Sequence, residues 1–150
     1  MAAEKGSKMK RTPLLRIASV VSLLFAAGHT VGGTKSWSPI PDNDVFRAMN
    51  SFRFDVEGTS RTYADFYVGL GWSLSVFLFL QAVVLWQLAS LAKKASIELR
   101  PVIGSFLVAS LVLAVVSWKY ILLPPVLFSA VIAVFLGLAL LSGRPRVGVA

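Results

Sequence analysis

The chain has no cysteine and only one histidine among its 150 residues. The lack of cysteine excludes disulfide bonds, a thiolate nucleophile and any iron–sulfur or cysteine-ligated zinc site. A zinc ion usually takes three or four protein ligands, and a single histidine leaves such a site short of strong ones. We therefore expect no metal and no cofactor. A haem with His29 as its axial ligand has no second feature in its favour.

Charged residues are also scarce. Asp, Glu, Lys and Arg make up 15% of the chain against 56% hydrophobic residues, and the mean hydropathy is +0.74. A soluble domain carries about 25% charged residues, so this composition cannot cover a water-exposed surface. The net charge of +8 would indicate nucleic acid in a soluble protein, but here the basic residues flank apolar runs. We expect an integral membrane protein surrounded by the lipid bilayer, with no nucleic acid partner.

Four apolar runs predict an all-α fold, a four-helix transmembrane bundle. The predicted helices cover about 14–31, 62–91, 102–120 and 125–141 of the transmembrane domain 14–141. Residues 1–13 form a basic tail that we expect to be disordered, and residues 142–150 form a second tail. The run 14–31 also fits a cleavable signal peptide, with Ala26-Ala27-Gly28 as the cleavage site. The sequence leaves that alternative open.

The positions of the basic residues predict which segments face the cytoplasm. If both termini are cytoplasmic, the inner segments hold Lys5, Lys8, Lys10, Arg11, Arg16, Lys93, Lys94, Arg100, Arg144 and Arg146. The outer segments then hold only Lys35, Arg47, Arg53, Arg61 and Lys119. Positive residues are in excess on the cytoplasmic side of membrane proteins. We therefore predict a multi-pass protein with both termini cytoplasmic.

The outer loop 32–61 is the longest polar connection. It opens with Gly32-Gly33 and turns at Pro41, and Asp42, Asn43 and Asp44 offer oxygens that can cap a helix. Apolar residues then recur at helical spacing, namely Val45, Phe46, Met49 and Phe52. We predict a short amphipathic helix over 44–54 in this first extracytoplasmic loop. Gly58 would end it, and Thr59 or Ser60 would cap the second long helix.

The stretch 52–72 combines both charge signs with several aromatic rings just before and inside the second long helix. The predicted topology brings it to the depth at which the first helix carries its histidine. The candidate ligand-binding residues are His29, Arg53, Asp55, Arg61, Tyr63, Asp65, Tyr67 and Trp72. They would line an outward-facing crevice between the first two long helices. Arg53 or Arg61 would meet the anionic head group of a small amphipathic ligand, and rings such as Phe66 would flank its apolar part.

Several alternatives remain open for these residues. Asp65 suits the first turn of a helix and lies four residues after Arg61, so a structural ion-pair network is one alternative. His29 with Asp65 or Asp55 could act as an acid/base pair on a lipophilic substrate, although no nucleophilic serine is placed beside it. Gln81 and Gln87 could hydrogen-bond another helix or line a transport path. A membrane partner and a homo-oligomer also remain open.

Residues 51–71 resemble a segment of a bacterial family of small four-helix integral membrane proteins with no assigned activity. The similar features are Ser51-Phe52-Arg53-Phe54-Asp55, Gly58, Arg61-x-Tyr63, Asp65-Phe66-Tyr67 and Gly69-x-Gly71, with Gly28-His29 late in the first helix. This resemblance implies a bacterial inner membrane and supplies no reaction. In layout the chain also resembles the four-helix membrane family of glutathione and eicosanoid metabolism. Of that family's Arg-x-x-Asn-x-x-Glu pattern, Arg47 and Asn50 match, and Arg53 reverses the last charge.

Overall fold

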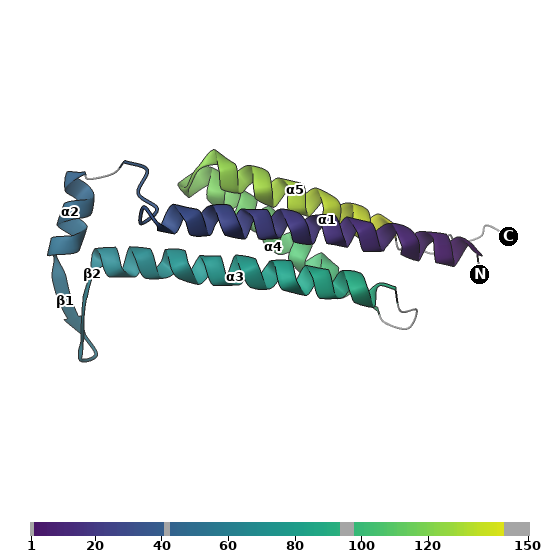
Figure 1. Cartoon of the computed structure of the whole chain (residues 1–150), viewed down its shortest axis with the longest axis horizontal. Helices are drawn as coiled ribbons and strands as arrows, with labels where there is room; N and C mark the ends of the chain where they lie inside the picture. Colours follow the sequence, from purple (N-terminus) through teal and green to yellow (C-terminus); the bar gives the residue numbers. More distant parts are fainter. Residues whose placement is uncertain (1, 41–42, 94–97, 143–150) are drawn as a thin grey trace. The chain divides into compact units, whose positions relative to one another are not determined.

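The computed structural model describes residues 2–40, 43–93 and 98–142, with side chains given from Arg11 onward. Its elements follow one another as α1 Ala2–Gly33, α2 Asp44–Ser51, β1 Arg53–Val56, β2 Thr59–Thr62, α3 Tyr63–Leu91, α4 Arg100–Tyr120 and α5 Leu123–Leu141 (Figure 1). Among the described residues, four helical segments are long and apolar enough to cross a membrane, namely α3, α4, α5 and the part of α1 from Arg11 to Gly33. The chain is therefore a helical, multi-pass membrane protein.

The four predicted long helices are confirmed, with one large difference at the first. Helix α1 begins at Ala2 rather than at residue 14, and it continues through Pro13. The expected disordered tail is thus helical in its described part. Its Ala, Glu, Lys and Met residues have high helix propensity, and extending an existing helix adds one hydrogen bond for each residue fixed. Apart from Ser142, the predicted C-terminal tail lies outside the described residues, as do Pro41 and Asp42.

Helix α2 forms within the predicted range but ends three residues early, at Ser51. Asn43 caps its start, because the Asn43 side chain accepts a hydrogen bond of 2.8 Å from the Phe46 amide. Phe52 has extended backbone angles, so the chain leaves the helix there. An antiparallel hairpin follows, in which Arg53 pairs with Thr62 and Val56 pairs with Thr59. This hairpin differs from the sequence prediction, in which its first residues belong to the helix.

Two residues make the turn of the hairpin. Glu57 and Gly58 have φ angles of 51° and 75°, and the two positive values match a type I′ turn. Gly58 therefore has a turn conformation rather than the role of a helix breaker. The predicted caps Thr59 and Ser60 lie in β2, and Thr62 caps α3 instead. The Thr62 hydroxyl accepts from the Asp65 amide at 3.1 Å, and an Asp65 oxygen accepts from the Thr62 amide at 2.8 Å. This reciprocal pair is a capping box.

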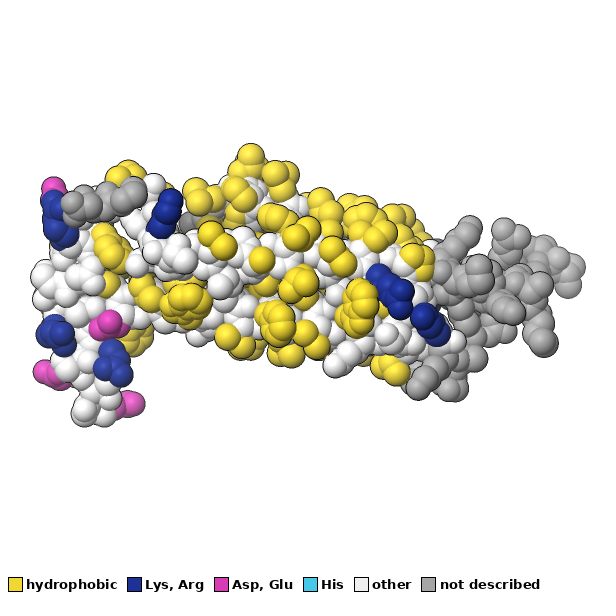
Figure 2. Space-filling model, in the orientation of Figure 1, with side chains coloured by type: hydrophobic (Ala, Val, Ile, Leu, Met, Phe, Trp, Pro, Cys, Tyr) yellow, Lys and Arg dark blue, Asp and Glu magenta, His cyan; other side chains and the backbone are white. Residues whose placement is uncertain are grey.

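The chain divides into two compact units, and each is described by itself. We call residues 26–79 the hairpin unit, and residues 1–25 together with 80–150 the bundle unit. Helices α1 and α3 each contribute residues to both. Hydrophobic side chains are exposed along the long helices, as a lipid-facing surface requires, while charged side chains gather over α2 and the hairpin (Figure 2).

Small side chains line the core of the bundle unit. The buried residues of α4 and α5 are Ile103, Ser110, Ser117, Ser129, Ile132, Ala133, Leu136 and Ala139. Serine and alanine at such positions let helix backbones approach closely in lipid. From α1, the Ser19 hydroxyl donates to the Ala82 carbonyl of α3 at 2.7 Å. The Phe25 ring of α1 stacks on the Phe128 ring of α5 at 5.1 Å. The core of this unit thus joins all four long helices.

Candidate functional site

The site in the hairpin unit starts from the turn that ends α1. The Trp37 amide donates to the Gly32 carbonyl, and the Ser36 amide donates to the Gly33 carbonyl, both at 3.0 Å. These two bonds are those of a Schellman motif. Ser36 and Trp37 both have a φ of 51°, a left-handed conformation that costs an L-residue about 1 kcal/mol or more. The strained turn directs the Trp37 side chain back onto the end of α1.

Glycines make the space that the Trp37 indole occupies. A β-carbon added at Gly71 of α3 would lie 2.5 Å from the indole, and one at Gly33 of α1 would lie 2.8 Å from it. Both distances are far shorter than a normal carbon–carbon contact. The indole Nε1 also donates to the His29 carbonyl at 2.8 Å. Trp37 therefore fills the space between the end of α1 and the first turns of α3, where the sequence analysis placed an open crevice.

Three of the predicted site residues lie around Trp37. The Nε2 atom of His29 is 3.0 Å from the Gly71 carbonyl, and because a carbonyl can only accept, Nε2 carries the proton. The His29 ring lies 5.3 Å from the Trp37 ring, and the Trp72 ring meets Trp37 edge-on at 5.2 Å. The Tyr67 hydroxyl donates to the Trp37 carbonyl at 3.0 Å. His29, Tyr67 and Trp72 were all predicted site residues, whereas Trp37 at their centre was not.

A second group of aromatic residues lies at the hairpin and the start of α3. Tyr63 contacts Phe52 at 5.6 Å and Phe54 at 5.1 Å between ring centroids, and Phe54 contacts Phe66 at 5.5 Å. These spacings are typical of favourable ring pairs. Phe52, Tyr63 and Phe66 are each more than half exposed, at 59%, 53% and 57%. We call these four residues the aromatic row.

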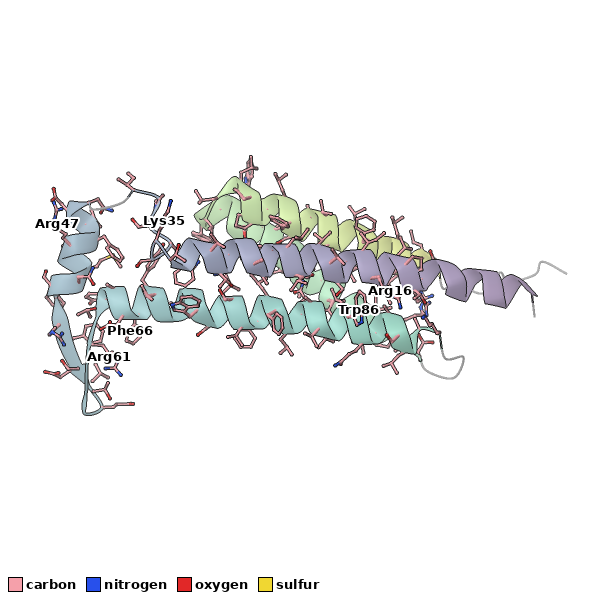
Figure 3. All side chains as sticks on the ribbon, in the orientation of Figure 1. Arg16, Lys35, Arg47, Arg61, Phe66 and Trp86 are labelled. Atoms are coloured by element: carbon pink, nitrogen blue, oxygen red, sulfur yellow. The ribbon has the colours of Figure 1, made fainter. Side chains whose placement is uncertain are left out.

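The hairpin register decides which charged residues lie beside the aromatic row. Arg61 is directly opposite Phe54, so both side chains leave the hairpin on the same face. Figure 3 shows the labelled Arg61 and Phe66 on the α3 side of the hairpin. Arg53 and Asp55 are one residue out of phase with Phe54 and lie on the other face. Of the two predicted head-group contacts, the register therefore places Arg61 beside the rings.

Direct ion pairs do not join the predicted charged cluster. Asp65 is attracted by Arg61 and Arg53, but no pair within 4.0 Å links Arg53, Asp55, Arg61 or Asp65 among the described residues. The ion pair seen in the hairpin unit joins Arg47 and Asp44 of α2. Asp65 instead uses its carboxylate in the capping box. The predicted ion-pair network is thus replaced by a helix cap with two arginines nearby.

The acid/base hypothesis requires a carboxylate beside the His29 ring, and no described residue supplies one. The His29 hydrogen bond goes to the Gly71 carbonyl, and neither Asp65 nor Asp55 bonds to its ring in the described parts of the chain. Nor do three or more His, Asp or Glu side chains gather as a metal site within residues 11–40, 43–93 and 98–142. The hydrogen bond of His29 instead connects α1 to α3.

In the bundle unit, Gln81 and Gln87 differ in their hydrogen bonding. Gln81 donates from Nε2 to the Ser22 hydroxyl of α1 at 3.1 Å, which confirms the predicted hydrogen bond to another helix. Gln87 is exposed and makes no hydrogen bond with a described residue. The two glutamines therefore do not form a continuous polar path. At the end of α4, the Lys119 ammonium lies 5.1 Å from the centre of the exposed Tyr120 ring.

Comparison with known proteins assigns no family or function to the chain. No protein-family model, no curated protein and no solved structure matches the chain. The functional interpretation therefore depends on the residues and the contacts described above.

Proposed function

We propose that the chain is a non-catalytic membrane protein that binds a small amphipathic anion on the aromatic row of its hairpin. The single observation that carries this proposal is the row itself, a set of contacting and largely exposed rings with Arg61 on the same face. Exposed apolar patches rimmed by polar residues are typical of binding surfaces. The crevice between α1 and α3 is not the proposed site, because Trp37 fills it.

The chemistry of the ligand follows from the side chains. Three exposed rings supply an apolar surface for a chain or a flat ring system, and Arg61 supplies a planar cation that suits a carboxylate or phosphate. The Arg61 Nη1 atom bonds only to the neighbouring Ser60 carbonyl in the described structure, at 2.9 Å. Asp65 is nearby, but its carboxylate already accepts the Thr62 amide. A negatively charged head group would therefore find Arg61 available.

The orientation belongs to the same proposal. The distribution of Lys and Arg favours both termini in the cytoplasm, and the resemblance over residues 51–71 favours a bacterial inner membrane. The hairpin and α2, as an amphipathic helix, then lie in the first extracytoplasmic loop. A ligand would reach the aromatic row from the outer aqueous phase or the outer leaflet.

Dansyl undecanoic acid and its methyl ester are suitable probes for this site, since they differ only in the charge of the head group. Binding is measured by dansyl fluorescence with the protein in phosphatidylcholine nanodiscs, after subtraction of empty nanodiscs. We expect Arg61→Gln to weaken binding of the acid about tenfold, because a hydrogen bond to a charged group contributes about 1.5–3 kcal/mol. Binding of the ester should not change.

Arg53→Gln is the matched control, because Arg53 carries the same charge on the other face of the hairpin. It should bind the acid as the wild type does. Equal loss in the two variants, or equal binding of acid and ester by the wild type, would show that Arg61 recognises no anionic head group. In either case the proposed function fails.

A further inference from the structure

The bundle unit contains two arginines that the function proposed for the hairpin does not use. Arg11 lies on α1, and Arg100 is the first residue of α4. Both side chains are half-buried. The Arg11 Nε atom donates to the Ala139 carbonyl of α5 at 3.3 Å. We propose that Arg11 and Arg100 together bind the phosphate group of an anionic phospholipid.

The guanidinium groups of Arg11 and Arg100 have too little negative charge beside them. Burial disfavours the charge on Arg11 most strongly, the charge of Arg100 adds to this, and the opposite charge of Glu98 offsets only part of it. The Glu98 carboxylate accepts the Arg100 backbone amide at 2.9 Å. The Arg100 guanidinium makes no hydrogen bond and no ion pair with any described residue. Two half-buried cations of like charge are costly without an anion, and a phosphate could accept hydrogen bonds from both.

A third arginine of the bundle unit provides a useful contrast. The guanidinium of Arg16 lies 5.1 Å from the centre of the Trp86 ring (Figure 3). A ring face stabilises a cation that has no carboxylate beside it. Arg11 and Arg100 have no ring partner in the described structure, so the compensation must come from elsewhere.

The start of α4 adds further positive potential. Leu99 gives the helix no side-chain cap, the Glu98 carboxylate already accepts the Arg100 amide, and Pro101 in the first turn has no amide hydrogen to satisfy. The first turn of a helix carries partial positive charge and favours an anion. Arg100 therefore presents its guanidinium at a helix end that itself attracts phosphate.

The position of both residues in the chain points to a lipid. Arg11 lies on α1 just before the apolar run that begins at Leu14, and Arg100 is the first residue of the span Arg100–Tyr120. If each of the four helices crosses the membrane once, the first and third spans start on the same side. Phospholipid phosphates lie at the ends of such spans, and anionic lipids attract basic side chains there.

Native mass spectrometry of the detergent-solubilised full chain tests the proposal. Wild-type protein is titrated with dioleoyl phosphatidylglycerol and, separately, with zwitterionic dioleoyl phosphatidylcholine. We expect the anionic lipid to bind about tenfold more tightly, and this preference to disappear in Arg11→Gln/Arg100→Gln. The control Arg53→Gln/Lys119→Gln has the same net charge as that variant and should keep the preference.

The single variant Arg100→Gln separates a loss of lipid binding from a folding defect. The Arg100 guanidinium bonds to no described residue, so its removal should not unfold the protein. We expect this single variant to keep the wild-type unfolding midpoint in detergent and to lose part of the preference. Inorganic phosphate as competitor separates the two sources of a phosphate group. No preference for phosphatidylglycerol in the wild type, equal loss in the control, or displacement of the lipid by millimolar inorganic phosphate would each overturn the lipid site.

Discussion

Helices α1 and α3 are joined in two different ways in the two units of the chain. In the bundle unit, Ser19 bonds to the Ala82 carbonyl and Gln81 bonds to the Ser22 hydroxyl. In the hairpin unit, His29 bonds to the Gly71 carbonyl, and the Trp37 indole fills the space beside that bond. The first link uses polar side chains beside buried small residues. The second uses two large rings against glycines.

This difference shows that a small residue in a membrane helix can have either of two structural effects. Ala82 is buried, and it lets Ser19 reach the backbone of α3 directly. Gly71 is smaller still, but the gap that it leaves is occupied by a ring from the connecting segment. Small residues permit close helix packing, and they equally permit a third segment to insert. At Gly71 the inserted side chain is the Trp37 indole, which comes from the segment that follows α1.

The two links should also differ in energy. Interhelical hydrogen bonds in membrane proteins contribute about 0.6 kcal/mol on average and up to about 1.7 kcal/mol. Removal of a buried tryptophan side chain costs about 3–5 kcal/mol, and the partly buried Trp37 should fall at the lower end of this range. The link in the hairpin unit should therefore depend on the indole more than on the histidine, and the link in the bundle unit should depend on several weak bonds.

The largest effect is expected for Trp37→Ala. Loss of the indole removes the packing against Gly33 and Gly71 and the bond to the His29 carbonyl, so we expect the free energy of unfolding to fall by about 3 kcal/mol. Unfolding in dodecyl sulfate, followed by circular dichroism, measures this. Trp118→Ala is the control, because the Trp118 side chain is 75% exposed. A similar loss in both variants would mean that Trp37 is not a packing centre.

A smaller effect is expected for Gly71→Ala. The new β-carbon would lie 2.5 Å from the Trp37 ring, and such overpacking costs about 1–3 kcal/mol. Gly69→Ala makes the same change two residues away on α3, where a β-carbon would meet nothing within 4 Å. That control should be neutral or slightly stabilising, because alanine favours a helix more than glycine does. If both variants behaved alike, the indole would not lie against Gly71 in the membrane.

The long helices could be predicted from the sequence because run length and composition alone define them. The hairpin could not, for two physical reasons. Its turn has Glu57 in a left-handed conformation, where asparagine, aspartate or glycine is the usual indicator. Phe52 also continued the helical spacing of Phe46 and Met49, although the chain is extended at Phe52. Without the hairpin register, Arg53 and Arg61 were indistinguishable as head-group contacts.

Trp37 was missed for a similar reason. A Schellman motif usually has glycine in its left-handed position, but here Ser36 takes it, and Trp37 follows with the same positive φ. The contact of Trp37 with Gly71 joins residues far apart in sequence, and neither periodicity nor composition indicates it. The glycine pairs Gly32-Gly33 and Gly69-x-Gly71 were visible, but their spacing did not show that a ring would fill the space between them.

The smallest predicted effect concerns the bond between Gln81 and Ser22, and a double-mutant cycle with Ser22→Ala and Gln81→Leu measures it. We expect a coupling free energy of about 0.6 kcal/mol. Ser22 also donates to the Ala18 carbonyl at 2.9 Å, so its hydroxyl keeps a partner when Gln81 is replaced. Gln87→Leu is the matched change at an exposed position and should show no coupling to Ser22→Ala. Equal coupling for both glutamines would contradict a specific bond. A coupling well above about 2 kcal/mol would contradict the comparison of the two links, because the polar hydrogen bonds of the bundle unit would then contribute about as much as the packing of Trp37.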